Sequence, residues 1–100
     1  MIKHIVMWRL KDRAHGNDRQ TNCALIKAML EALRGRITGM TAVEAGIDIS
    51  RTDSSYDVVL YSEFADRESL DAYQGNPEHL AVKSFIVEAS AERRIVDYEV

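Results

Sequence analysis

Residues 2–10 carry apolar side chains at both even-numbered and odd-numbered positions. β-branched and aromatic residues are frequent in this segment, and they are typical of strands. In a strand, alternate side chains point to opposite faces of the sheet. The segment therefore predicts a strand with two partly apolar faces. Ile5 and Met7 lie on one face, and Val6, Trp8 and Leu10 lie on the other.

The rest of the chain predicts further helices and three more strands. After a polar loop at 11–18, Ile26, Met29, Leu30 and Leu33 recur at helical spacing, which predicts a helix over 19–33. Alternating segments predict strands at 41–50, 56–64 and 94–100. The short polar turn between the strands at 41–50 and 56–64 predicts that they form a hairpin.

The stretch 73–80 predicts a corner between two helices. Asp66 is a suitable N-cap for a short helix that contains Tyr73. Asn76 and Pro77 then predict a second helix, because asparagine caps well and proline suits the first helical position. His79 falls in the first turn of this second helix. We expect any chemistry in the chain to involve this corner.

The resulting order, β-α-β-β-α-β, is the split βαβ arrangement. It predicts a single α+β domain over residues 1–100, with helices on one face of a four-stranded antiparallel sheet. The second apolar face of the sheet then needs a cover, and the sheet of a second copy in a twofold dimer would supply it. We expect Trp8 on that face, because an exposed tryptophan is costly. A monomer with a modest apolar patch is the alternative.

Composition and charge limit the classes of partner and cofactor that we expect. A net charge of −3 gives no electrostatic reason to bind nucleic acid, and no segment resembles a membrane span or an export signal. Cys23 is the only cysteine and cannot form an internal disulfide, which suits the cytoplasm. The three histidines lack metal-ligand spacing, and no glycine-rich phosphate loop is present. We therefore expect a cytoplasmic protein without a metal or another cofactor.

Along nearly its whole length the sequence resembles the stress-responsive A/B barrel (Dabb) family. The resemblance rests on the opening strand with its histidine, on the strand at 56–64, and on the helix corner with its Tyr-x-x-x-Pro-x-His spacing. It implies that residues 1–100 form one Dabb domain. It further implies a ferredoxin-like protomer that pairs into a homodimeric α/β barrel.

The resemblance also implies a site. In a plant member of the family, the residues that match Tyr73 and His79 take part in a cofactor-free aldol cyclisation of a linear polyketide. Catalytic roles for Tyr73 and His79 are implied here, with His4, Trp8 and Asn76 contacting the ligand. Family members commonly carry histidine at the position that Asn76 occupies.

The chemistry of these residues leaves three functions open. A histidine titrates near neutrality, so His79 is able to remove a proton next to a carbonyl while Tyr73 hydrogen-bonds the enolate of a small apolar carbonyl or polyketide-like compound. The same residues also suit a non-enzymatic stress or structural protein with a filled barrel, in which His4 is a hydrogen-bonded core residue. The third function is a cofactor-free monooxygenase, with which Trp8 in a cavity would be compatible.

Overall fold

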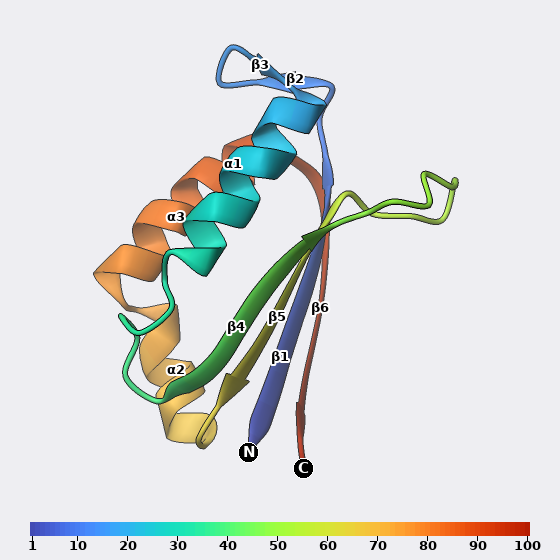
Figure 1. Cartoon of the computed structure of the whole chain (residues 1–100). Coiled ribbons are helices and arrows are strands. Elements are labelled where there is room, and N and C mark those ends of the chain that lie inside the picture. The colour runs from blue at the N-terminus through green and yellow to red at the C-terminus, as the bar shows by residue number, and fades with distance from the viewer.

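In the computed structural model, which describes residues 1–100, one antiparallel sheet carries all the helices on a single face (Figure 1). Its four strands are β1 (Ile2–Leu10), β4 (Met40–Ile47), β5 (Val58–Phe64) and β6 (Ser90–Glu99), in the order β4-β5-β1-β6. Strand β5 lies between β1 and β4 and is antiparallel to both. The predicted split β-α-β-β-α-β order and the predicted antiparallel sheet are both confirmed.

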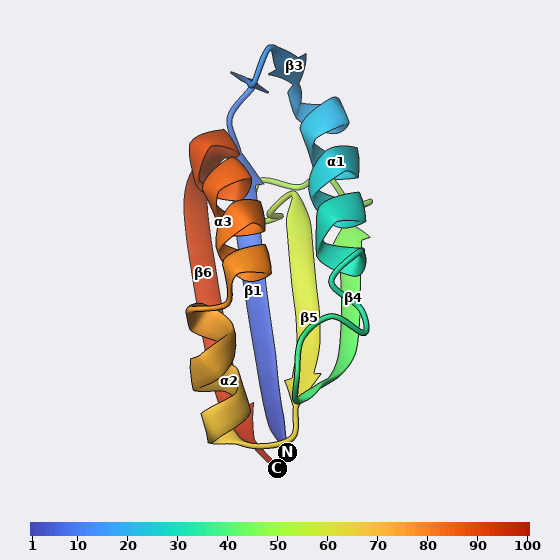
Figure 2. The same cartoon turned by 90° about the vertical axis from the view of Figure 1, so that its left-hand side faces the viewer.

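Three helices form the second layer: α1 (Arg19–Glu31), α2 (Arg67–Gln74) and α3 (Pro77–Ala89). Figure 2 shows α1 over the β4 and β5 side of the sheet, and α2 and α3 over the β1 and β6 side. The side chains of Asp18, Asp66 and Asn76 cap the three helices by accepting hydrogen bonds from backbone N–H groups of the first turn. The caps of α2 and α3 are the predicted ones. None of the three combines the length and apolarity that crossing a membrane requires.

Several element boundaries differ from the predicted ones. Helix α1 ends at Glu31, two residues early, and the chain then turns through Gly35 at a φ of +77°. Strand β6 begins at Ser90, directly after α3, because this edge strand pairs with β1 from Leu10 back to Ile2. Strands β4 and β5 do pair as predicted, but the connection between them spans residues 48–57 and is longer than a tight turn.

The polar segment at 11–18, which is predicted to be a loop, contains a small hairpin. Strands β2 (Arg13–Ala14) and β3 (Asn17–Asp18) pair across His15 and Gly16. Both turn residues have positive φ, 54° for His15 and 75° for Gly16. Positive φ at both central residues is the signature of the type I′ turn, whose twist matches that of paired strands.

Trp8 lies on the opposite side of the sheet from the one predicted. Ile2, His4, Val6, Trp8 and Leu10 all face the helices and are buried, with Trp8 only 7% exposed. The tryptophan belongs to a cluster of twelve buried residues between the sheet and helices α1 and α3. The prediction that a partner covers Trp8 is therefore wrong, since the chain's own helices bury this side chain.

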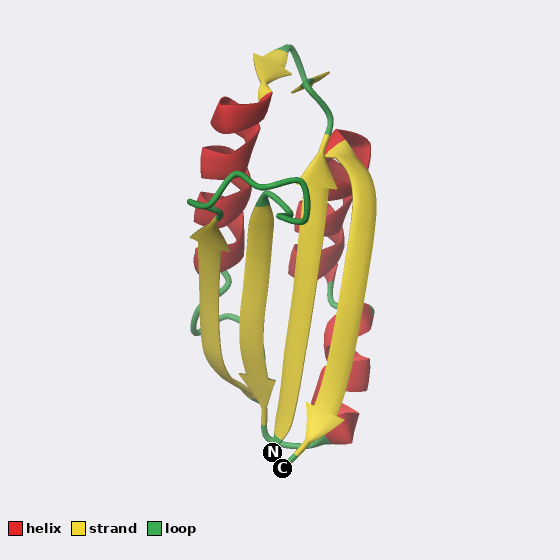
Figure 3. Ribbon diagram, turned by 90° about the vertical axis from the view of Figure 1, so that its right-hand side faces the viewer, coloured by secondary structure: helices red, strands yellow, loops and turns green.

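Figure 3 shows that no helix covers the other face of the sheet. That face still carries exposed apolar side chains. Met7, Val96 and Tyr98 are 40%, 53% and 41% exposed there, and Ile5, Val59 and Tyr61 lie beside them in register. We call these six residues the open face. Their positions confirm that the strands have two apolar faces, as the alternation in β1 and β5 predicts.

Gly39 provides a test of the packing between the β4 end of the sheet and α2. Its φ is +83°, and a Cβ placed there would lie 2.5 Å from the Ser69 Cβ in the first turn of α2. Gly16 has a similar φ but open space around it. We expect Gly16→Ala to lower the free energy of unfolding by roughly 1–2 kcal/mol, the cost of a left-handed residue. Gly39→Ala should lower it by roughly 1–3 kcal/mol more, because of the steric clash. Equal losses for the two variants in chemical denaturation would contradict this packing.

Candidate functional site

A pocket of about 150 Å³ opens between the sheet and the helices, where two hydrophobic clusters meet. The larger cluster contributes Val6, Trp8 and Leu60 from the sheet and Ile86 from α3. The smaller one contains six buried residues beneath α2, and its Tyr73 reaches the pocket. Val82 packs against both clusters and also lines the cavity. One protomer forms this pocket with its own residues.

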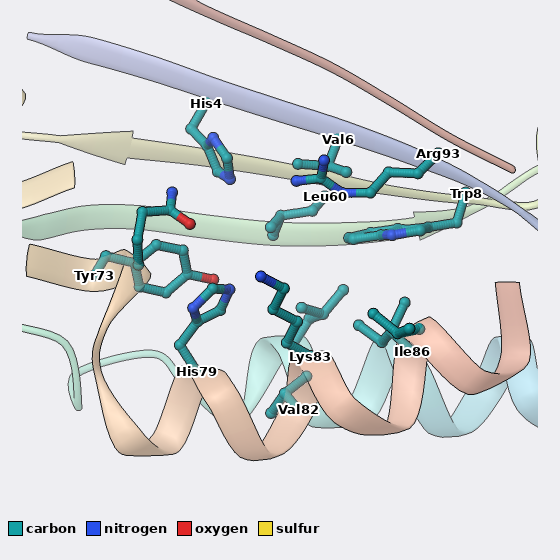
Figure 4. Close-up of a pocket in the computed structure, with 13 residues that line it drawn as sticks. His4, Val6, Trp8, Leu60, Tyr73, His79, Val82, Lys83, Ile86 and Arg93 are labelled. Atoms are coloured by element: carbon teal, nitrogen blue, oxygen red, sulfur yellow. The ribbon is translucent and has the colours of Figure 1, made fainter. Parts of the chain in front are cut away.

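Tyr73 and His79 form the polar end of the pocket (Figure 4). Tyr73 is the penultimate residue of α2, and His79 lies in the first turn of α3, so the two side chains come from the two sides of the Asn76-Pro77 corner. Their rings are close, with centroids 4.0 Å apart and planes tilted by 32°. The contact is a packed ring pair rather than a hydrogen bond.

The Tyr73 hydroxyl and the His79 Nδ1 are both buried, and neither has a hydrogen-bond partner within the protein. A buried polar atom without a partner costs about 1–3 kcal/mol, so native proteins contain few of them. Arg19 Nε is the other such side-chain atom in the chain, and it lies outside this pocket. Two unpartnered polar atoms at one end of a cavity are what a site for a polar ligand group requires.

Burial sets the protonation states of this pair. It raises the pKa of Tyr73 to about 12, so the phenol keeps its proton and acts as a hydrogen-bond donor at neutral pH. Burial lowers the pKa of His79 below its ordinary value of 6.5. The positive charge of Lys83 acts in the same direction, while the nearby backbone groups of Gln74 and Tyr73 oppose the shift in part. His79 is therefore a neutral imidazole at pH 7, with one nitrogen able to accept a proton.

His4 lies on the sheet side of the same end of the pocket. Its ring is 3% exposed and meets the Tyr73 ring edge-on, with centroids 6.0 Å apart. The His4 Nδ1 lies 2.5 Å from the Asp97 Oδ1 on the neighbouring strand β6. A carboxylate that accepts a hydrogen bond from Nδ1–H fixes the orientation of the imidazole ring. His4 thus combines the predicted hydrogen-bonded core position with a place in the pocket wall.

The structure brings together four of the five residues that the sequence singles out. His4, Trp8, Tyr73 and His79 all line the pocket. Asn76 does not line it, because its side-chain oxygen accepts hydrogen bonds from the backbone N–H groups of Glu78 and His79 and so caps α3. Asn76 acts on the site by holding the helix that presents His79.

Three charged residues line or support the pocket without having been predicted to do so. Asp97 orients His4, while Lys83 of α3 and Arg93 of β6 line the pocket. The spacing of Lys83 from His79, at i and i+4, was a usable signal that both lie on one helix face. No local signal places Asp97 or Arg93, because their positions depend on the register of β6 against β1.

Metal ligands do not gather anywhere in the chain. No group of three or more histidine, cysteine, aspartate or glutamate side chains has the geometry to hold a metal ion. Cys23 is fully buried in the larger cluster, and burial raises the pKa of its thiol. A buried thiol of raised pKa is a packed apolar residue rather than a nucleophile.

The split order, the single helical layer and the four-stranded sheet define a ferredoxin-like α+β protein. Residues 2–100 match the model of the stress responsive A/B barrel domain, so the chain belongs to the Dabb family. No curated protein shows significant similarity to the chain.

Solved structures with the same fold come from several organisms. A dimeric ferredoxin-like protein of unknown function from Bacteroides fragilis has a TM-score of 0.86 at 29% identity, covering 99% of this chain and 95% of that one. A Dabb family protein from Mesorhizobium loti has a TM-score of 0.72 at 28% identity, with coverage of 99% and 95%. The hydroxynitrile lyase of Passiflora edulis has a TM-score of 0.82 at 17% identity, with coverage of 99% and 92%, which shows a shared fold alone.

The lowered pKa of His79 predicts how stability depends on pH. In the unfolded chain His79 has an ordinary pKa of about 6.5 and takes up a proton before the folded protein does. Its contribution is therefore fully present above pH 6.5 and is lost as the pH falls towards the lower folded pKa. We expect the NMR titration midpoint of His79 to lie below 6.5. The free energy of unfolding should fall between about pH 7 and 5, and less so in His79→Asn.

His15 serves as the control histidine, because it lies outside the pocket and stacks on Phe85. His79→Asn should remove part of the pH dependence of the free energy of unfolding. His15→Asn should leave that part unchanged. A His79 midpoint at or above 6.5 would contradict the proposed neutral imidazole.

Proposed function

We propose that this domain binds a small carbonyl compound in the pocket, and that His79 and Tyr73 transfer a proton next to the carbonyl without a cofactor. The observation that carries the proposal is the pair of unpartnered polar atoms, the Tyr73 hydroxyl and the His79 Nδ1, at the polar end of an otherwise mostly apolar cavity. A ligand carbonyl there would give the phenol its missing hydrogen-bond acceptor.

The protonation states suit this division of roles. The neutral imidazole of His79 takes a proton from the carbon next to the carbonyl, and the C–H electron pair moves into an enolate. The Tyr73 hydroxyl donates a hydrogen bond to the enolate oxygen, where negative charge develops. The imidazolium then returns its proton, either to carbon or, after the enolate attacks a second carbonyl of the same ligand, to the new alkoxide. The first course is enolisation, and the second is an aldol cyclisation.

The size of the pocket favours a compact ligand. A cavity of about 150 Å³ is comparable to cavities that bind one benzene molecule. A small ring or a short branched chain fits this space between Trp8 and Ile86, whereas an extended polyketide needs more room. The hydroxynitrile lyase among the similar structures supports the idea that this fold accommodates lyases, although a shared fold does not specify a reaction.

Proton exchange provides a test that does not require the natural substrate. In D₂O, NMR should detect faster loss of the protons next to the carbonyl of cyclohexanone or of levulinate when the protein is present. Loss of a general base typically costs ~10²–10⁴ in rate, so we expect His79→Ala to remove nearly all the acceleration. Tyr73→Phe should reduce the acceleration and should weaken binding of the ketone by a smaller factor, because the hydrogen bond strengthens as charge develops on the enolate oxygen.

Matched controls lie outside the pocket. His15→Ala and Tyr56→Phe remove the same functional groups elsewhere and should exchange at the wild-type rate. An acceleration that survives in His79→Ala would remove His79 as the base. No acceleration of either ketone by the wild-type protein would overturn the proposed reaction.

We also propose that the open face is the interface of a homodimer. Six apolar side chains gather on an uncovered sheet, and a second copy of that sheet would remove them from water. The similar proteins from Bacteroides fragilis and Thermobifida fusca are described as dimeric, which supports this assembly. Face-to-face packing of two such sheets would produce the barrel implied by the family resemblance.

Two substitutions at similarly exposed apolar residues separate dimerisation from folding. Met7 is 40% exposed on the open face, and Leu25 is 37% exposed on α1. Met7→Lys should yield a folded monomer by light scattering, since it places a second positive charge at the interface directly opposite Arg94, its cross-strand neighbour. Leu25→Lys should remain a dimer. A wild-type protein that is monomeric at micromolar concentration would refute the interface.

A further inference from the structure

The pocket holds two positive charges that the proposed proton transfer does not use. Figure 4 shows Lys83 rising from α3 and Arg93 descending from β6, with their charged ends in the space between the Tyr73–His79 end and Trp8. The two residues belong to elements that face each other across the cavity. Both are surface-exposed residues whose side chains line the pocket.

Neither side chain is neutralised within the protein. No carboxylate lies within ion-pair distance of Lys83 or Arg93, and neither side chain makes a hydrogen bond. Every acidic residue of α3 and β6 is already engaged with a different basic group. The pairs are Glu78 with Arg36, Glu88 with His15, Glu92 with Arg9 and Arg94, Asp97 with His4, and Glu99 with Arg67.

Two unpaired cations that converge on a cavity repel each other unless an anion lies between them. The charge of Lys83 also opposes protonation of His79 and contributes to the lowered pKa of that imidazole. A neutral ketone would leave both charges unpaired when it binds. A ligand with a negative group would gain charge-assisted hydrogen bonds from both side chains, and the guanidinium of Arg93 is able to hold a carboxylate through two nitrogens.

We propose that the ligand of this pocket is an oxo acid, a compact carbonyl compound whose carboxylate is bound by Lys83 and Arg93. The carbonyl lies against Tyr73 and His79, and the carbon skeleton lies against the apolar wall. This inference rests on the proposed function for the position of the carbonyl and adds the chemical class of the ligand. The two cations also retain a second role in the reaction, because they stabilise the negative charge that spreads over the ligand as the enolate forms.

Binding tests this assignment separately from catalysis. Trp8 is the only tryptophan of the chain and lines the pocket, so its fluorescence reports occupancy. Levulinate and methyl levulinate differ only by the ester group that removes the charge. We expect levulinate to bind at least tenfold more tightly than its ester. One hydrogen bond between charged groups contributes more free energy than a tenfold change in affinity requires.

The variants remove one charge each. Lys83→Met and Arg93→Gln should each weaken levulinate binding by roughly tenfold and leave methyl levulinate within about twofold. Arg13→Gln removes the same charge from β2, outside the pocket, and should bind both compounds as the wild type does. Circular dichroism of each variant would confirm that it is folded.

Three results would overturn the oxo-acid proposal: no detectable binding of levulinate, equal binding of acid and ester, or an acid preference that survives in both pocket variants. Each of these is distinguishable from failure of the proposed reaction. Levulinate could bind through Lys83 and Arg93 while its protons exchange no faster than in buffer. That result would support the oxo-acid class of ligand and would refute the catalytic roles of His79 and Tyr73.

Discussion

The side-chain alternation of β1 controls both surfaces on which this protein depends. The even-numbered residues of the strand include His4, Val6 and Trp8, which point into the space beneath the helices where the core and the pocket form. The odd-numbered residues include Ile5 and Met7, which point to the open face. Since β1 is paired on both sides, with β5 and β6, its register cannot shift by one residue without exchanging these two sets. The pocket and the open face are therefore coupled through a single strand.

The sequence predicts the architecture well because each element carries its own local signal. Capping by Asp66 and Asn76, the proline at the start of α3 and the apolar stripe of α1 depend only on neighbouring residues. The side of the sheet on which Trp8 lies has no such local signal. A period of two separates the residues of a strand into two sets, but it does not say which set the helices cover. The predicted side of the sheet for Trp8 is therefore the wrong one.

The same distinction explains which parts of the candidate site were predictable. Tyr73 and His79 share one short stretch with a recognisable spacing, and His4 follows from the first strand. Asp97 and Arg93 reach the pocket only because β6 returns beside β1, a contact between opposite ends of the chain. Asn76 shows the converse, since a residue within the corner motif caps a helix instead of lining the cavity. Membership of a motif and membership of a site are different properties.

The break between α2 and α3 has a geometric consequence for the pair on either side of it. Tyr73 and His79 are six positions apart, and at 100° per residue an uninterrupted helix would point them in directions about 120° apart. The helix ends at Gln74 and begins again at Pro77, and across this interruption the two rings meet with centroids 4.0 Å apart. Asn76 and Pro77 thus convert two side chains that a straight helix would separate into neighbours. A substitution that fused α2 and α3 would dismantle the pair without altering either residue.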